Sequence, residues 1–305
     1  MLDVIIVGAG VAGLTAGLYA ARAGMSALIL ERIFPGGQIA RAHIVENYPG
    51  SPEPSSGLDL AMRFKEHAEK HGALIETAEV TGFDLEGAVK KVVSADKIYK
   101  ARSVVLAMGA SYRSLGLPKE KKLVGAGVSY CATCDGAFFR GKDVVVIGGG
   151  DTAVEDALYL TGLASRVYLV HRRDELRAQH ALQKAAMKSG QIEFIWDSEV
   201  TEILGSTLVE GVRIRNKKTQ EEKTVSVSGV FIAVGIIPHT DEVKGTVETD
   251  EAGYIKTDIW MRTNLPGVFA AGDIVAKPLK QLVTAAADGA TAIYGAQHYI
   301  RENEV

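Results

Sequence analysis

The same short passage occurs twice in this chain, and it restricts the possible folds more than any other feature. In the first copy, the β-branched run Val4-Ile5-Ile6-Val7 is followed directly by Gly8-Ala9-Gly10-Val11-Ala12-Gly13. In the second copy, the passage from Asp143 to Ala153 aligns without gaps on Asp3 to Gly13. Such a β-branched run predicts a strand that is buried on both faces of a parallel sheet. Glycines between strand and helix allow a tight turn and the close approach of a pyrophosphate, so we expect two dinucleotide-binding folds.

The two copies differ where the second strand ends, and this difference predicts two different nucleotides. In the first copy Ala27-Leu28-Ile29-Leu30 ends at Glu31, whose carboxylate can accept the hydroxyls of an adenosine ribose. The second copy has basic side chains at and after this place, namely His171, Arg172, Arg173 and Arg177. Arginines in place of an acid favour a 2′-phosphate, and therefore NADPH over NADH, by roughly a hundredfold or more. The alternative is a solvated helix face on which these arginines pair with Asp174 and Glu175.

If the second fold takes NADPH, the first is expected to take FAD, because a flavin can pass electrons from a nicotinamide to a disulfide. The loops over 35–38 and 46–50 supply flexible backbone and polar groups after the first fold. Near the end of the chain, a strand over 267–271 runs into Gly272 and Asp273. The Asp273 carboxylate can bind the ribityl hydroxyls of a flavin. The alternative is that Asp273 caps a helix beginning near Gln281.

Both cysteines of the chain lie in the segment Cys131-Ala132-Thr133-Cys134-Asp135. A pair at this spacing can close a small disulfide ring and reopen it through a reactive thiolate. The alternative is half of a zinc site. Zinc needs about four ligands, whereas the chain has no second cysteine pair and its seven histidines show no ligand-like spacing. We therefore expect a dithiol with a redox role.

Length and charge restrict the number of domains and the kinds of partner that the chain can have. A chain of 305 residues exceeds the roughly 250–300 residues of a single core, which predicts two domains. A net charge of −3 does not indicate a nucleic-acid partner. With no cysteine left for structural bridges, we expect a cytoplasmic protein. The uncharged run over 4–21 is nearly long enough to span a membrane, but its glycines and the absence of a basic leader favour a buried strand, a turn and a helix.

Other segments predict supporting structure. Residues 103–109 resemble 229–235, and each run is expected to be a buried strand that ends at a glycine. Helical spacing is present over 63–70 and 285–299. Alternating patterns over 74–100 and 192–227 predict small antiparallel sheets attached to each domain.

Taken together, the dithiol before the second glycine segment, the arginines after it and the terminal Gly-Asp segment resemble the low-molecular-weight thioredoxin reductases. This resemblance covers essentially the whole chain. It implies an α/β fold with two Rossmann-like dinucleotide-binding domains, the NADPH domain being inserted into a discontinuous FAD domain. We place the FAD domain at 1–113 and 244–305 and the NADPH domain at 118–238, with hinges near 113–118 and 238–243. The resemblance also implies a homodimer, in which electrons pass from NADPH through FAD and the dithiol to thioredoxin or a thioredoxin-like protein.

The resemblance assigns roles to individual residues. Cys134 would lie against the flavin and take its electrons, Cys131 would attack the disulfide of the partner, and Asp135 would handle the thiol proton. FAD would be held by Gly8, Gly10, Gly13, Glu31, Gln38, Asn47, Asp273 and Gln281. NADPH would be held by Gly148, Gly150, Asp151, Thr152, His171, Arg172, Arg173 and Arg177. Thr152 stands where the family usually has serine, and Lys280 stands where arginine is common. Phe138 and Phe139 are either local core or a docking surface for thioredoxin.

The same residues are compatible with two other functions. The first is an NADPH-dependent flavoprotein with another acceptor, such as a peroxiredoxin-reducing component or a ferredoxin–NADP reductase of similar fold. The cysteines weigh against the ferredoxin–NADP reductase, because that chemistry does not need them. The second is a nucleotide-responsive binding protein whose cysteine pair holds zinc. A yellow protein whose colour bleaches with NADPH would exclude this second reading.

Overall fold

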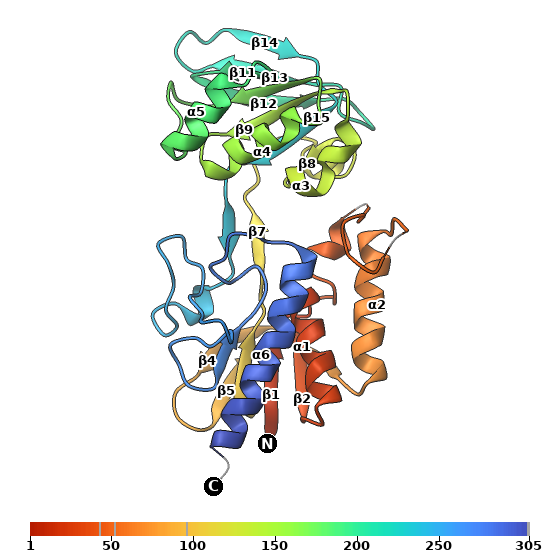
Figure 1. Ribbon diagram of the computed structural model, residues 1–305, viewed down its shortest axis with the longest axis vertical. Coiled ribbons are helices and arrows are strands. Elements are labelled where there is room, and N and C mark those ends of the chain that lie inside the picture. Colours follow the sequence, from red (N-terminus) through yellow and green to blue (C-terminus); the bar gives the residue numbers. More distant parts are fainter. Residues whose placement is uncertain (43, 52, 96, 304–305) are drawn as a thin grey trace. The chain divides into compact units, whose positions relative to one another are not determined.

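The chain forms two compact units in the computed structural model, which describes residues 1–42, 44–51, 53–95 and 97–303 (Figure 1). Unit 1 contains residues 1–111 and 237–305, and unit 2 contains residues 112–236. The chain therefore leaves unit 1, builds the whole of unit 2 and returns. The outgoing strand β7 (Ala110–Tyr112) and the returning strand β16 (Ile236–Pro238) pair with each other in a two-stranded sheet.

Unit 1 is built on a sheet of seven strands with the order β3-β2-β1-β6-β5-β4, in which β17 also pairs with β6. Val4–Val7 of β1 lies parallel between Ala27–Leu30 of β2 and Ser103–Leu106 of β6, and all three segments are buried. Strand β5 pairs antiparallel with β4 on one side and with β6 on the other. The elements of this unit are β1 (Leu2–Val7), α1 (Val11–Arg22), β2 (Ala27–Glu31), η1 (Ile39–Arg41), α2 (Gly57–Lys70), β3 (Leu74–Thr77), β4 (Val80–Asp84), β5 (Lys90–Ser94), β6 (Ile98–Leu106), η4 (Asp241–Val243), β17 (Val268–Ala270) and α6 (Leu282–Glu302).

Helices α1 and α6 lie side by side on one face of this sheet (Figure 1). Their contact is made through small residues, because a Cβ at Gly289 of α6 would lie only 2.2 Å from the carbonyl oxygen of Ala12 in α1. Ala16, Ala292 and Ala296 are fully buried in the same core cluster. This close approach of two backbones explains why the sequence of α6 is rich in alanine and glycine.

Unit 2 repeats the central part of this architecture. Its parallel sheet has the order β11-β10-β9-β15-β8, and β9 lies between β10 and β15 as β1 lies between β2 and β6. A separate antiparallel sheet is formed by β12, β13 and β14. The elements are η2 (Lys121–Leu123), β8 (Val128–Ser129), α3 (Ala132–Asp135), η3 (Gly136–Phe139), β9 (Asp143–Gly148), α4 (Asp151–Thr161), β10 (Arg166–Val170), α5 (His180–Lys188), β11 (Ile192–Ile195), β12 (Ser198–Leu204), β13 (Gly211–Asn216), β14 (Glu222–Val225) and β15 (Gly229–Ala233).

The prediction of two dinucleotide-binding folds is confirmed, as are the buried strands expected within 103–109 and 229–235. The prediction of small antiparallel sheets over 74–100 and 192–227 is wrong for the first strand of each segment. Strands β3 and β11 instead add to the parallel sheets as edge strands. Each follows a helix, α2 or α5, and a strand–helix–strand crossover returns the chain parallel to its starting strand. Across the residues that the structure describes, no helix is both long and apolar enough to cross a membrane.

Candidate functional site

The first glycine segment forms a turn between β1 and α1 that leaves one backbone edge open. Gly8 has a φ of +102°, and a Cβ there would lie 2.4 Å from the carbonyl oxygen of Ala107. A Cβ at Gly13 would lie 1.8 Å from the carbonyl oxygen of Gly8. A Cβ at Gly10, in contrast, would meet no atom within 4 Å. The protein's own packing therefore requires Gly8 and Gly13, whereas Gly10 leaves space at the N-terminus of the twelve-residue helix α1, where an anion is favoured.

Glu31 lies at the end of β2 and is anchored beside this turn. Its Oε2 atom accepts a hydrogen bond of 2.8 Å from the backbone N–H of Ala9, and its Oε1 atom accepts one of 3.1 Å from Ile33. Each carboxylate oxygen can accept a further hydrogen bond, so the side chain is oriented by the loop and can still bind a hydroxyl.

The loop that carries Gln38 packs against the same turn. The N–H of Gly36 donates to the carbonyl oxygen of Ala9 at 2.7 Å. A Cβ at Gly37, whose φ is +58°, would lie 3.1 Å from the Cα of Gly10. The Gln38 side-chain amide donates to the carbonyl oxygen of Ala110. The two consecutive glycines thus bring this loop to the open side of the turn.

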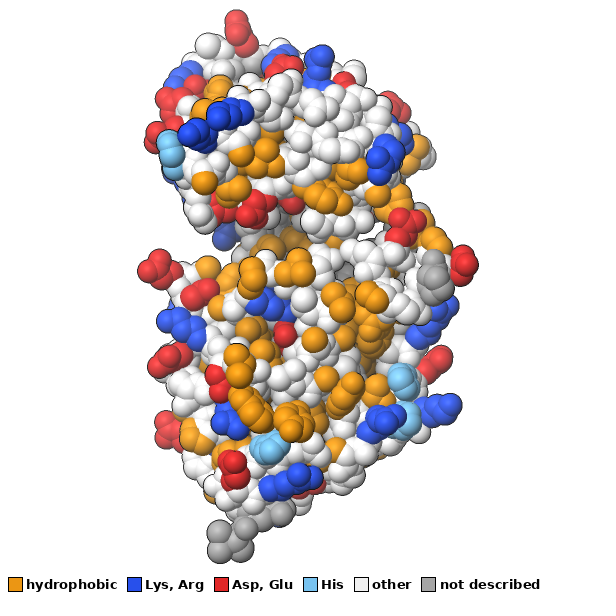
Figure 2. All heavy atoms as spheres, viewed as in Figure 1, with side chains coloured by type: hydrophobic (Ala, Val, Ile, Leu, Met, Phe, Trp, Pro, Cys, Tyr) orange, Lys and Arg blue, Asp and Glu red, His pale blue; other side chains and the backbone are white. Residues whose placement is uncertain are grey.

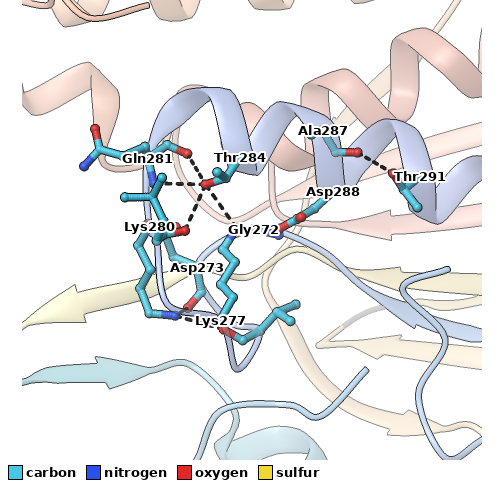
Figure 3. Close-up of polar contacts among 11 residues, drawn as sticks. Gly272, Asp273, Lys277, Lys280, Gln281, Thr284, Ala287, Asp288 and Thr291 are labelled. Atoms are coloured by element: carbon cyan, nitrogen blue, oxygen red, sulfur yellow. Dashed lines mark hydrogen bonds and ion pairs between the residues drawn. The ribbon is translucent and has the colours of Figure 1, made fainter. Parts of the chain in front are cut away.

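The C-terminal Gly-Asp segment also reaches the turn. A Cβ at Gly272, whose φ is +84°, would lie 2.9 Å from the Cβ of Ala12 at the start of α1. Figure 3 shows the Gly272 N–H and the Lys277 ammonium group converging on Asp288, at 3.0 Å and 2.5 Å. The Lys277 and Asp288 side chains are both only 13% exposed, so this buried ion pair holds the segment against α6. The sequence patterns did not reveal Asp288, because its partners lie outside α6.

Asp273 contributes a buried carboxyl group next to this ion pair. Its Oδ1 atom is buried and has no hydrogen-bond partner among the described residues. Burial raises the pKa of Asp273, and the charges of Lys277 and Lys280 partly oppose this. Lys280 donates to the carbonyl oxygens of Asp273 and Val275 at 3.1 and 2.9 Å (Figure 3). A buried acceptor without a donor is what a ligand hydroxyl would satisfy.

The alternative in which Asp273 caps the last helix is wrong. Helix α6 is capped by Gln281, which forms a reciprocal capping box with Thr284 (Figure 3). The side-chain amide of Asn47 donates to Oε1 of Gln281 at 3.1 Å. The structure therefore brings together Asn47 and Gln281, two expected site residues that are distant in the sequence.

The second glycine segment repeats the first, with one addition. A Cβ at Gly148 would lie 2.4 Å from the carbonyl oxygen of Ala233, whereas a Cβ at Gly150 would meet no atom within 4 Å. A Cβ at Gly149 would lie 2.3 Å from the His171 ring. His171 is 4% exposed, and its buried Nε2 has no partner within the described ranges. Burial lowers the pKa of His171, and the charge of Arg177 lowers it further. The ring therefore lies directly against the glycine turn.

Asp151 and Thr152 begin helix α4, directly after this turn. Asp151 accepts hydrogen bonds from the backbone and side-chain amides of Gln179, at 2.7 and 3.2 Å. The N–H of Arg177 donates to the carbonyl oxygen of Gly149 at 2.7 Å. The segment after β10 is thus tied to the glycine turn by two contacts. The sequence did not suggest Gln179 as one of these partners.

The three arginines after β10 are exposed, and they are not paired as the alternative required. Asp174 instead pairs with Lys218 at 3.2 Å. Among the described residues, no ion pair joins Arg172, Arg173 or Arg177 to a carboxylate. The solvated-face alternative predicted pairing with Asp174 and Glu175, so the structure does not support it. Exposed arginines without a carboxylate partner can bind an anion without first breaking an ion pair.

The two cysteines form a disulfide, with a Cα–Cα distance of 5.3 Å. The disulfide closes the first turn of the short helix α3, in which Cys131 Sγ accepts a hydrogen bond of 3.2 Å from the Cys134 N–H. Cys134 is exposed and Cys131 is half-buried. Over the part of the chain that the structure describes, no cluster of three or more His, Cys, Asp or Glu could hold a metal ion.

Ser129 links the backbone of Cys131 to Asp135. Its hydroxyl donates to Oδ2 of Asp135 at 2.6 Å and accepts from the Cys131 N–H at 3.1 Å. Burial raises the pKa of Asp135, and the hydrogen bond from Ser129 partly opposes this. The acid expected to handle a thiol proton is therefore oriented toward the dithiol turn. The sequence did not identify Ser129, because a serine two residues before a cysteine has no distinctive pattern.

The two phenylalanines after this turn have different environments. Phe139 is buried and packs edge-on against Phe231, with ring centroids 5.2 Å apart. Phe138 is 39% exposed. Phe139 is therefore local core, and Phe138 alone is available as a contact for another protein.

These features fit the two nucleotides that the sequence predicts. Both turns have an open position, at Gly10 and Gly150, where the backbone can approach a pyrophosphate. The first turn is flanked by a carboxylate that can bind ribose and by the buried acceptor of Asp273. The second is flanked by arginines that form no ion pair with a carboxylate of the described residues. FAD supplies two-electron transfer from a nicotinamide to a disulfide.

Comparisons with known proteins agree with this arrangement. The pyridine nucleotide-disulphide oxidoreductase family matches residues 2–289. A thioredoxin reductase of Bacillus subtilis (strain 168) is 48% identical over 302 residues, covering 98% of this chain and 95% of the relative. One from Peptoclostridium acidaminophilum is 46% identical over 307 residues, covering 99% and 98%. The crystal structure of thioredoxin reductase from Streptococcus pyogenes MGAS5005 superimposes with a TM-score of 0.95 at 47% identity, covering 99% of both chains.

Proposed function

The chain belongs to the pyridine nucleotide-disulphide oxidoreductase family and is an NADPH-dependent flavoprotein disulfide oxidoreductase, and we propose that its electron acceptor is the disulfide of thioredoxin or a thioredoxin-like protein. The observation that carries this proposal is the Cys131–Cys134 disulfide, placed in a turn with one cysteine exposed. Such a disulfide can accept two electrons from the flavin side and pass them to a disulfide in another protein. The relatives named thioredoxin reductase support this choice of acceptor.

Unit 1 is the proposed FAD-binding unit. The open edge at Gly10 would receive the pyrophosphate, with Gly8 and Gly13 shaping the turn. Glu31 would bind the adenosine ribose, and Asp273 would satisfy its buried oxygen with a ribityl hydroxyl. Gln38, Asn47 and Gln281 would complete the site with amide groups.

Unit 2 is the proposed NADPH-binding unit. Gly148 shapes the turn, and Gly150 leaves room for the pyrophosphate at the start of α4. Asp151 and Thr152 provide polar groups in the first turn of that helix. The 2′-phosphate would be bound by basic side chains, namely Arg172, Arg173 and Arg177. His171 would act through its contact with the turn at Gly149.

The dithiol would work in two steps. In the first, two electrons and two protons open the disulfide, with Cys134 receiving the electrons and Asp135 supplying a proton to a thiolate. In the second, the Cys131 thiolate attacks the acceptor's disulfide, forming one S–S bond as the acceptor's bond breaks and its leaving sulfur takes up a proton. Cys134 then attacks the mixed disulfide, which releases the reduced acceptor and restores the Cys131–Cys134 bond.

A homodimer is proposed through unit 1. Figure 2 shows hydrophobic side chains over the face of this unit that carries α1 and α6. Tyr19 and Tyr294 lie on these helices at 49% and 54% exposure, and both line a groove between the helices. Exposed aromatic residues of this kind favour an interface. We also propose a cytoplasmic location, with no nucleic-acid or membrane partner, because both cysteines belong to the redox pair and the net charge is small.

An assay of NADPH oxidation by the purified yellow protein tests the acceptor. We expect rapid oxidation only when an oxidised thioredoxin is present, and much slower oxidation with NADH. Rapid turnover with ferredoxin or with the peroxiredoxin system, and none with any thioredoxin, would show that the proposed identity of the acceptor is wrong. The Cys134→Ser variant serves as the control, since it should bind the flavin but lose turnover with thioredoxin.

A further inference from the structure

Ser129 ends strand β8, two residues before the first cysteine of the disulfide. Strand β8 lies at the edge of the parallel sheet of unit 2, where Ser129 pairs with Phe231 of β15. Ser129 is only 3% exposed, so bulk water has almost no access to its side chain. The sheet therefore holds the Ser129 hydroxyl in a fixed and nearly dry position beside the turn over 131–135 that carries the disulfide.

The Ser129 hydroxyl oxygen has three polar neighbours. It lies 2.6 Å from Oδ2 of Asp135, 3.2 Å from the carbonyl oxygen of Cys131 and 3.1 Å from the backbone nitrogen of Cys131. A hydroxyl group has one proton to donate and two lone pairs that can accept. The Cys131 N–H can only donate, so it occupies one lone pair. The single hydroxyl proton is then left with two competing acceptors, the Asp135 carboxylate and the Cys131 carbonyl oxygen.

The charge of Asp135 decides between these acceptors. When Asp135 is ionised, its carboxylate is the stronger acceptor, and the 2.6 Å contact has the usual length of a hydrogen bond from a hydroxyl to a carboxylate. The Cys131 carbonyl oxygen remains paired in this state, because the N–H groups of Cys134 and Asp135 donate to it at 3.3 and 3.1 Å. When Asp135 is protonated, its O–H can donate to the second lone pair of Ser129, and the hydroxyl proton can turn to the Cys131 carbonyl oxygen. Ser129 can therefore pair with Asp135 in either state.

We propose that Ser129 is a positioning residue for Asp135, and that its hydroxyl proton turns to the Cys131 carbonyl oxygen whenever Asp135 becomes protonated. No proton passes through Ser129, because the hydroxyl keeps its own proton and only rotates. When Asp135 gives its proton to a thiolate, the rotation back provides the new carboxylate with a charge-assisted hydrogen bond. This bond stabilises the carboxylate in a site where burial raises the pKa of Asp135. The inference rests on the proposed role of Asp135 in opening the disulfide, but not on the identity of the acceptor.

The hydrogen bond from Ser129 can be altered without altering a charge near Asp135. Neither β8 nor the short helix η3, which flank this turn, carries an ionisable residue. The cysteines do not titrate while they are joined. The ionisable groups at α3 and on helix α4, which packs against α3, are Cys131, Cys134, Asp151, Glu155, Asp156 and Tyr159. All of these remain in variants of Ser129.

The test follows the flavin of the holoenzyme after mixing with one equivalent of NADPH, without oxygen and without an acceptor protein. The yellow colour should bleach as the flavin is reduced and return as the electrons open the disulfide. Because Asp135 must be protonated to supply a proton, the rate of return should fall above the pKa of Asp135. In Ser129→Ala the carboxylate loses a hydrogen bond, so this fall should move to higher pH by about one unit. Ser129→Thr retains a hydroxyl and should restore the wild-type midpoint.

The matched control is Ser198→Ala, which removes another buried hydroxyl of unit 2. Ser198 begins β12, is 4% exposed and donates to the carbonyl oxygen of Trp196 at 2.6 Å. Its curve should overlay that of the wild type. Overlap of Ser129→Ala with the wild type would overturn the proposal. An equal loss of rate at every pH would also overturn it, since a merely structural role predicts that result, as would an equal shift in Ser198→Ala.

A second measurement needs no variant of Ser129. The chain has only two cysteines, so labelling them with ¹⁵N gives one amide signal for Cys131 and one for Cys134 in nuclear magnetic resonance spectra. In the oxidised holoenzyme the Cys131 signal should shift as Asp135 titrates, because its N–H donates to the hydroxyl that turns. A Cys131 signal that does not change with pH, or that changes equally in Asp135→Asn, would refute the inference.

These experiments separate the role of Ser129 from the proposed function. Neither uses thioredoxin, so their results do not depend on the acceptor. A wild-type flavin that stays bleached would show that the proposed transfer to the disulfide is wrong. The amide titration of Cys131 would still decide whether the Ser129 hydroxyl follows the protonation of Asp135.

Discussion

The proposed NADPH site makes a quantitative prediction for the double variant Arg172→Ala/Arg173→Ala. Both side chains are exposed, and within the described residues neither forms an ion pair with a carboxylate. Neither therefore has to be released from a protein partner before binding a phosphate. Each charge-assisted hydrogen bond to the 2′-phosphate is worth about 1.5–3 kcal/mol. The lower end applies to exposed groups, so two contacts together contribute about 3 kcal/mol, or roughly a hundredfold in preference.

The assay compares kcat/KM for NADPH and for NADH, with thioredoxin held at saturation. We expect the double variant to lose about a hundredfold in kcat/KM for NADPH and to keep its value for NADH, because NADH has no 2′-phosphate. The control is Arg166→Ala, an exposed arginine of the same unit that pairs with Glu193 at 3.6 Å. It should leave both values unchanged.

Three results would refute this reasoning. An unchanged ratio of the two kcat/KM values would show that these arginines do not read the 2′-phosphate. An equal loss with both nucleotides would show that they act on binding in general or on the fold. A ratio that falls in the control as strongly as in the double variant would assign the effect to overall charge.

Four further variants and one pH dependence test other features of the structure. Cys134→Ser should leave reduction of the flavin by NADPH intact and abolish reduction of thioredoxin, as seen by flavin bleaching and by NADPH oxidation; sustained thioredoxin turnover would contradict the relay. Gly10→Ala should keep the unfolding temperature of the FAD-free protein while weakening FAD binding at least tenfold, because its Cβ meets no protein atom and can obstruct only a ligand. Gly13→Ala should lower both the unfolding temperature and the affinity for FAD, since its Cβ would lie 1.8 Å from a carbonyl oxygen. Equal behaviour of the Gly10 and Gly13 variants in calorimetry and FAD titration would contradict this account. Lys90 is 1% exposed, and burial lowers its pKa below the ordinary 10.5. Between the lowered pKa and 10.5 the unfolded chain binds more protons than the folded one, so the free energy of unfolding should rise with pH there. Lys90→Met should remove this rise, as measured by denaturant titrations at several pH values.

Much of the first site could be read from the chain because its constraints are local. A glycine whose Cβ would strike a carbonyl oxygen only a few residues away, as Gly13 does with Gly8, leaves a pattern in a short window. The same holds for the strand that ends at Glu31. The exchange of this acid for His171 and arginines in the second copy is likewise visible once the two passages are aligned.

The expectations that failed concerned how segments assemble. An edge strand such as β3 or β11 has the same alternating pattern whether it joins a parallel sheet or an antiparallel one. The connection decides between them, since a helix precedes each of these strands. The cap of α6 was similarly decided by its surroundings. Gln281 meets Thr284 and Asn47, and Asn47 is far away in the sequence.

By itself, then, the sequence determined that the chain contains two nucleotide-binding folds of unlike specificity and one dithiol, because each depends on residues within a single strand–turn–helix passage. Only the tertiary structure decided what surrounds them. It places the His171 ring against Gly149 and the Asp288 carboxylate on the Gly272 N–H. These partners belong to different elements, so their contacts arise only when helices and strands pack. A buried carboxyl group acquires its pKa and its role from that packing rather than from its neighbours in the chain.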